Sequence, residues 1–168
     1  MSRWEQVSNW WKAHVSGTDE EREYLDHLEA ESHLIRALSG PTGMLVDIEI
    51  SPHDLELTAS FRGAPDDEPV KWTIDAVWWT LRLPGGFTHQ ESMEGPGEPD
   101  LDPEWTQWYI DVISAYLKGS WRHVPLRAGI LGRRRVTGVR IDVGSTGGHM
   151  ELAPGDAGAV ITSYSSPP

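Results

Sequence analysis

Residues 70–83, VKWTIDAVWWTLRL, form the longest strand-like stretch of the chain and contain three of its nine tryptophans. Apolar side chains occupy the even positions from 70 to 76 and the odd positions from 77 to 83. A period of two is typical of a strand with one buried face. The change of frame predicts either a bulge near residues 76–79 or a second half that is covered on both faces.

The tryptophans of this stretch are expected to lie in the core. Burial of one tryptophan contributes several kcal/mol, from roughly 25 cal/mol per Å² over an area on the order of 200 Å². The stretch should therefore be central in a sheet. The alternative is functional: Trp78 or Trp79 faces outward and stacks against a sugar, a base or a partner protein.

The other elements follow from periodicity and from start and stop signals. Helices are predicted over residues 2–15, over 18–39 with a capping box from Thr18 to Glu21, and over 102–118 with Pro103 in the first turn. Two strand-like runs, 44–50 and 55–61, are separated by the turn SPHD and predict an antiparallel hairpin. The predicted strands besides the tryptophan-rich stretch are 44–50, 55–61, 136–143, 149–152 and 159–163.

These elements predict an α+β fold. We expect a single domain over residues 1–168, with an antiparallel sheet of about five or six strands covered on one face by an N-terminal helical hairpin and a third helix. Hairpin-length turns between the strands disfavour a parallel sheet. Residues 86–102 predict a long connection, residues 120–132 are ambiguous because Pro125 opposes a helix, and residues 165–168 are expected to fray.

The composition limits the chemistry that the chain can perform. It has no cysteine, which excludes disulfides, thiol nucleophiles and thiolate metal sites. The first residues, MSRWEQVSNWWKAHVSG, lack the apolar core of a signal peptide, and no run of about 18 apolar residues follows. A cytoplasmic location is therefore expected.

The net charge of −12 is unevenly distributed. Residues 118–141 contain seven bases and no acid. Because the whole chain has a net charge of −12, the rest of it carries a net charge of −19. Such a body should repel nucleic acid and anionic membranes and attract a basic protein partner. The alternative is that the acids only confer solubility and that the arginines pair with carboxylates of the same chain.

Glu31 is the main candidate for catalysis. It falls at position i+7 of the apolar stripe that Tyr24 begins on the second predicted helix, where an unpaired carboxylate is costly. Burial would raise its pKa and suit it to general acid or base chemistry, with His27 and Tyr109 as companions. The structural alternative is a carboxylate that reaches water or bonds to an arginine or a backbone group.

No metal or cofactor site is predicted. His27 and His33 lie about 120° apart around a helix, too far for one ion. Glu23, His27 and Glu31 share a face, but no second helix supplies the matching ligands. The glycines around Ser145 are typical of a hairpin turn and lack the spacing of a nucleophile elbow.

Three consecutive arginines, Arg133, Arg134 and Arg135, are a weak candidate for anion binding. Trp121 and His123 lie near them in sequence. The acidity of the chain and the absence of a matching motif oppose nucleic-acid binding. The alternative is that these arginines neutralise acidic neighbours at the start of a strand.

We therefore expect a non-enzymatic, acidic binding protein that occludes a basic surface of another protein, as bacterial toxin-immunity proteins and anti-defence inhibitors do. No motif identifies a family, and the oligomeric state is left open. The expected contacts are acidic loop residues and two tryptophans: Asp66, Asp67, Glu68, Glu94, Glu98, Asp100, Trp78 and Trp79. The alternative is a small ligand-binding protein or enzyme, with Glu31, His27 or Tyr109 in an aromatic pocket between the sheet and the third helix.

Overall fold

The computed structural model describes residues 19–92, 103–129, 132–144, 147–157, 160–161 and 164–165. Over these residues it contains two α-helices, one short 3₁₀ helix and one sheet. The helices are α2 (Asp19–Ser39), η1 (Gly40–Thr42) and α3 (Pro103–Leu117). The ten strands are β1 (Leu45–Ser51), β2 (Glu56–Arg62), β3 (Val70–Ile74), β4 (Trp78–Arg82), β5 (Phe87–Ser92), β6 (Trp121–Ala128), β7 (Arg134–Val143), β8 (Gly148–Pro154), β9 (Val160–Ile161) and β10 (Tyr164–Ser165).

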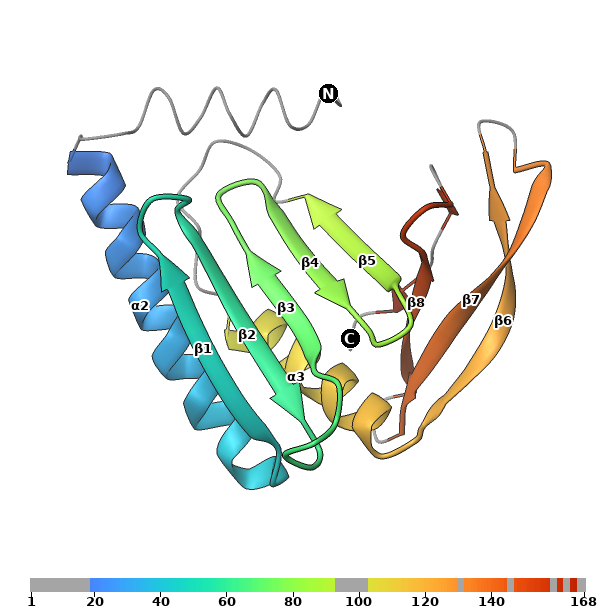
Figure 1. Ribbon diagram of the computed structural model, residues 1–168, viewed down its shortest axis with the longest axis horizontal. Coiled ribbons are helices and arrows are strands. Elements are labelled where there is room, and N and C mark those ends of the chain that lie inside the picture. Colours follow the sequence, from blue (N-terminus) through green and yellow to red (C-terminus); the bar gives the residue numbers. More distant parts are fainter. Residues whose placement is uncertain are drawn as a thin grey trace.

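The sheet is antiparallel in every described pairing. Its strands run in the order β1-β2-β3-β4-β5-β8-β7-β6-β9, with β10 beside β8. The first five strands form a meander, after which the chain passes through α3 and returns as β6, β7 and β8, so that β8 lies beside β5. Figure 1 shows α2 along the β1 edge and α3 behind the middle of the sheet, both on one face.

The predicted α+β class and antiparallel sheet are confirmed, whereas the predicted number of strands was too low. The helices α2 and α3 begin and end within one residue of the expected positions. The helix expected over residues 2–15 lies outside the described residues, so the predicted three helices become two in the described part. Ser165, where fraying was expected to begin, pairs with His149, and residues 166–168 are outside the described ranges.

The change of frame in the tryptophan-rich stretch is a hairpin turn, so both sequence-based explanations were wrong. β3 and β4 are separate strands in which Ile74 pairs with Trp79. The carboxylate of Asp75 closes the turn by accepting hydrogen bonds from the backbone N–H groups of Val77 and Trp78, both at 2.7 Å. Pairing position 74 with position 79 puts an even and an odd residue on the same face, which switches the apolar frame.

Two segments with no predicted strand also belong to the sheet. The expected connection over residues 86–102 begins with β5, in which only Phe87 is apolar, so period-two alternation of apolar residues is not visible there. β6 contains Pro125, which pairs with Thr137 and is exposed. Proline lacks a backbone N–H group, yet a strand tolerates it where that group is not needed by the neighbouring strand.

The core lies between the helices and the covered face of the sheet. At its centre, rings from β3 and α3 stack: Trp72 and Tyr109 have centroids 4.6 Å apart and an interplanar angle of 2°. Trp79 meets both rings edge-on, with centroid distances of 5.4 Å. Stacked and edge-on pairs are the favourable arrangements of aromatic rings. The core position expected for the tryptophan-rich stretch is therefore confirmed at Trp72 and Trp79.

The other side of the sheet, here called the open face, is covered by no helix among the described residues (Figure 1). Over β1 to β5 it carries mostly polar and charged side chains, with Leu45 and Trp78 as the apolar exceptions. One row of partners across the five strands consists of Glu49, Thr58, Thr73, Thr80 and Gln90. This face offers hydrogen-bonding groups but little apolar surface.

The open face also carries apolar side chains near β6. Leu126, which is 5% exposed, lies against Gly138 of β7. A Cβ atom added to Gly138 would overlap Leu126 and would lie 2.6 Å from the carbonyl oxygen of Leu152. A glycine is therefore required here because β6 side chains lie directly on the β7 backbone.

Candidate binding surfaces

Glu31 lies in the contact between α2 and α3. It is 3% exposed, and the hydroxyl of Thr106 donates a hydrogen bond to its Oε1 at 2.6 Å. Burial raises the pKa of Glu31 above its ordinary value, and the hydrogen bond from Thr106 partly opposes that rise. Among the described residues no cation lies within ion-pair distance of it. The contact is therefore a buried acid held by a hydroxyl, a partner that the sequence did not suggest.

No described hydrogen bond or ion pair joins Glu31 to His27 or to Tyr109. His27 is half-buried on α2. Tyr109 is fully buried in the aromatic stack, and its hydroxyl donates to Oε2 of Glu91 on β5 at 3.4 Å, whereas Glu31 faces Thr106. The volume expected to hold an aromatic pocket is filled by the stacked rings, and neither cavity described below is lined by these three residues.

The two adjacent tryptophans have different environments. Trp79 packs in the core, as described above, and its indole N–H is buried. Trp78 pairs with Ser92, shares the open face with Thr80, and is half-buried. Of these two candidate contact residues, Trp78 is the one that a partner on the open face could reach.

The first acidic loop, Asp66, Asp67 and Glu68, joins β2 to β3, and all three residues are exposed. Asp67 also has a structural task, because its carboxylate accepts a hydrogen bond from the backbone N–H of Ala64 at 2.8 Å. The other two carboxylates make no described hydrogen bond or ion pair, and Glu68 lies close enough to Tyr116 to add to the effect of burial in raising the pKa of that hydroxyl. The second acidic loop, with Glu94, Glu98 and Asp100, lies outside the described residues.

Most of the negative charge of the described residues is concentrated at the β1 side of the sheet. Residues 19–68, which comprise α2, η1, β1, β2 and the first acidic loop, contain 14 acids and three bases, a net charge of −11. On α2 the exposed acids are Asp19, Glu20, Glu23, Asp26 and Glu29. On β1 Asp47 and Glu49 are exposed as well.

The arginine-rich segment lies at the opposite side of the sheet, in the hairpin of β6 and β7. Arg134 and Arg135 pair across the strands with Ala128 and Arg127, and both are exposed, as is Arg133. These residues near the tip of the β6–β7 hairpin make no described ion pair. They form an exposed cationic patch, as the anion-binding alternative requires.

Farther from the tip, arginines are neutralised within the chain. Arg122 and Arg140 both bond to Asp142, the latter at 2.9 Å, and Arg140 also lies 3.9 Å from Glu151. Partial burial acts to raise the pKa of Asp142, but the hydrogen bonds and charges of Arg140 and Arg122 outweigh it and lower the pKa below the ordinary value. Internal pairing of arginines, the second sequence-based interpretation, therefore holds for this part of the hairpin.

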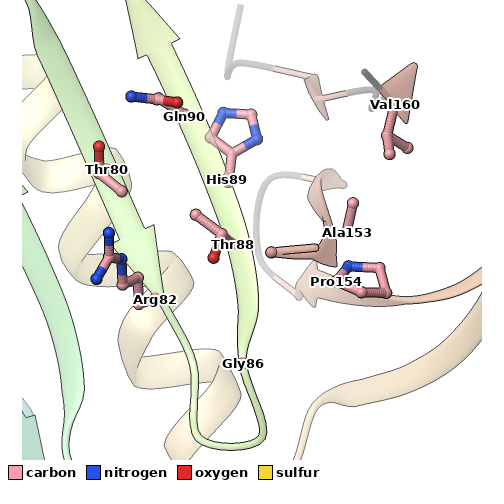
Figure 2. Close-up of a pocket in the computed structure, with 10 residues that line it drawn as sticks. Thr80, Arg82, Gly86, Thr88, His89, Gln90, Ala153, Pro154 and Val160 are labelled. Carbon is pink, nitrogen blue, oxygen red and sulfur yellow. The ribbon is translucent and has the colours of Figure 1, made fainter. Parts of the chain in front are cut away.

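A cavity of ≈ 570 Å³ lies on the open face where β4 and β5 meet β8 and β9 (Figure 2). Arg82 and Thr80 from β4 and Thr88 and Gln90 from β5 form its polar side, opposite Ala153, Pro154 and Val160. Arg82 is exposed and pairs across the strands with Lys71, and neither cation has a described ion-pair partner. Two adjacent cations beside a hollow are suited to an anionic ligand.

His89 also lines this cavity, although its side chain belongs to the covered face of β5. It is 3% exposed, and its Nδ1 lies 3.3 Å from the carbonyl oxygen of Glu151. Burial lowers the pKa of His89 below its ordinary value, against opposing effects of Glu91 and of the contact with Glu151. The histidine is therefore neutral at physiological pH and adds no charge to the cavity.

A second hollow, of ≈ 410 Å³, is a groove between α2 and β1. Leu25 from α2 and Ile48 and Ile50 from β1 provide its apolar walls. Polar groups from α2 line the same groove: Glu29, Ser32, His33 and Arg36. All three apolar side chains are only partly buried, so the groove leaves apolar surface accessible next to the acidic residues.

Comparison with protein-family models, with curated proteins and with solved structures finds no match. Among the described residues no group of three or more histidines and carboxylates is placed to hold a metal ion. None of the described helices has the length and apolar character needed to cross a bilayer. The function is therefore inferred from these surfaces alone.

Proposed function

We propose that the protein binds a basic surface of another protein and occludes it, as toxin-immunity proteins and anti-defence inhibitors do. The observation that carries this proposal is the net charge of −11 over residues 19–68, which lie together at one side of the sheet. A patch of one sign steers an oppositely charged partner and raises the association rate. The expected cytoplasmic location remains part of this proposal.

Local apolar surface supports the same interpretation. Rim charges mainly set the association rate and orientation, whereas affinity requires buried apolar contacts near the centre of an interface. The groove lined by Leu25, Ile48 and Ile50 lies within the acidic region and supplies such surface. Acidic residues around an accessible apolar groove are an arrangement suited to a cationic protein partner.

The proposal is tested by affinity capture with two baits in parallel, wild type and the double variant Asp66→Lys with Glu68→Lys. Asp67 is left unchanged because it holds the turn through Ala64. Proteins retained by wild type and lost by the variant are identified and purified. We expect the partner to be basic. Its rate of association with wild type should fall as salt is added, and its rate of association with the variant should be about tenfold lower. Wild type should also inhibit the activity of the partner. A partner of acidic or neutral surface, or binding that ignores both salt and the variant, would contradict the proposal.

A second candidate function is binding of a small anionic ligand in the cavity beside Arg82. The observation that favours it is the pair Lys71 and Arg82 on adjacent strands without a described acidic partner. We expect small dicarboxylates or phosphates to raise the melting temperature of wild type but not of Arg82→Gln. Equal behaviour of the two proteins would exclude this site.

A further inference from the structure

The β1 edge of the sheet is free within the described part of the chain. β1 pairs with β2 on one side, and no described strand pairs with its other side. An edge strand presents unpaired backbone N–H and C=O groups along its length. β1 is seven residues long, so its edge can receive a strand of ordinary length.

The side chains of β1 differ in character between its two faces. Asp47 and Glu49 lie on the open face and are exposed, while Ile48 and Ile50 point to the helix side and line the groove against Leu25. Asp47 forms an ion pair with Arg62 of β2 at 2.9 Å, whereas Glu49 has no described ion-pair partner. A strand that pairs with β1 would alternate in the same way. Its residues on the open face would lie beside the two carboxylates, and its residues on the helix face would enter the groove.

We propose that an extended segment of the partner, with basic and apolar residues in alternation, adds as a strand to the free edge of β1. This inference rests on the proposed function, because it names the part of the basic partner that is recognised. Backbone hydrogen bonds to the edge would provide affinity, and the groove together with Glu49 would select the side chains. Figure 1 shows that α2 runs beside this edge on the helix face of the sheet, so the helix-facing side chains of the added strand would pack toward α2.

The charges on β1 argue against a second copy of this chain as the occupant. Antiparallel pairing of two β1 edges would bring Asp47 and Glu49 of one copy beside the same residues of the other. Like charges opposite each other on paired strands are destabilising, whereas opposite charges are favourable. The edge is therefore protected against itself and complementary to lysine or arginine.

The test uses fluorescently labelled peptides of about eight residues and the full-length protein. The first peptide alternates lysine with valine, the second has the same composition in two blocks, and the third alternates but is N-methylated at every second backbone amide. We expect the alternating peptide to bind at least about tenfold more tightly than either of the others, because only it satisfies both faces and the backbone edge. Equal binding of the alternating and block peptides, or no binding of the alternating peptide, would overturn the inference.

Two protein variants locate the site. Glu49→Lys changes an exposed residue on the free edge, and Glu23→Lys makes the same charge change on α2, where Glu23 is exposed and does not line the groove. We expect Glu49→Lys to weaken binding of the alternating peptide about five- to tenfold. The change in the logarithm of the dissociation constant for Glu23→Lys should be less than half as large. Hydrogen exchange should show slower exchange of β1 amides when the peptide is bound. Equal weakening by both variants without protection of β1 would refute strand addition but would leave the electrostatic proposal standing, since that is tested separately with Asp66 and Glu68.

Discussion

Replacement of Thr106 by valine tests the buried contact between α2 and α3. Valine keeps the branched shape but removes the hydroxyl that donates to Glu31 at 2.6 Å. Loss of a hydrogen bond to a buried charged group costs about 1.5–3 kcal/mol, whereas the added methyl group gains up to about 0.8 kcal/mol. The loss is larger, so we expect the free energy of unfolding to fall by about 1–2 kcal/mol near pH 7.

The pH dependence of this deficit identifies its cause. The hydrogen bond from Thr106 lowers the pKa of Glu31 against the effect of burial, so its removal raises the folded-state pKa further. The folded variant then binds more protons than the unfolded chain at pH values between the unfolded and folded pKa of this carboxyl. Wild type and the variant both lose stability as pH rises through their raised folded-state pKa values, and the variant loses more because its folded-state pKa is higher. The deficit should therefore be small near about pH 4 and larger at neutral pH.

Urea unfolding at both pH values measures the deficit, with Thr106→Ser as the control that keeps the hydroxyl. The serine variant should show the pH dependence of wild type, although it loses a methyl group. A valine variant with a deficit independent of pH, or with none, would refute the assignment of Thr106 as the group that stabilises the carboxylate.

Three further predictions concern single features of the fold. Gly138→Ala should lower the free energy of unfolding by about 2 kcal/mol or more, because its Cβ would overlap β6 and the β8 backbone, whereas Gly144→Ala, with nothing within 4 Å of the added atom, should lower it far less in the same urea titration. Asp75→Ala should cost about 1–2 kcal/mol, because two backbone N–H groups lose their acceptor, and Asp75→Asn should restore most of this; thermal melts of the three proteins check it. Arg134→Glu combined with Arg135→Glu should lower the salt concentration at which the protein elutes from heparin, and an unchanged elution would remove the anion-binding interpretation of the hairpin tip.

The sequence predicted well those elements in which local signals and packing agree. The sequences of α2 and α3 begin with capping signals and carry regular apolar stripes, interrupted on α2 only by Glu31. The hairpin of β1 and β2 has a turn with Pro52 between two alternating runs. β5 was missed because apolar residues do not alternate along it. Its open face is polar, since no described helix covers it, and its covered face holds His89 and Glu91. The helix-facing position of Trp79 was predicted by its frame, but the hairpin that creates this frame was not.

The candidate site was less predictable, because its parts come from distant positions. Glu31 was found at the apolar stripe of α2, but Thr106 as its partner depends on how α2 and α3 cross, which no local pattern specifies. The groove joins Leu25 to Ile48 through tertiary packing alone. A sequence signal did exist for β1: acidic residues that alternate with isoleucines in a strand next to only one expected partner.

Segregation of charge determines how the two sides of the molecule can act. The strand order places six strand spacings between β1 and β7, which carries Arg134 and Arg135, or about 29 Å along the sheet at about 4.8 Å per spacing. Screening at physiological ionic strength has a length of about 8 Å, so the arginines of the hairpin tip cannot cancel the acidic surface around α2 and β1. A basic partner therefore meets one attractive side and one repulsive side, which fixes its orientation as well as its rate of approach. Reversal of Arg134 and Arg135 should leave the affinity for that partner unchanged, whereas reversal of Asp66 and Glu68 should weaken it. The two reversals change the net charge in opposite directions, so tighter binding after the arginine reversal, comparable in size to the weakening after the acid reversal, would show that net charge, not its placement, governs binding.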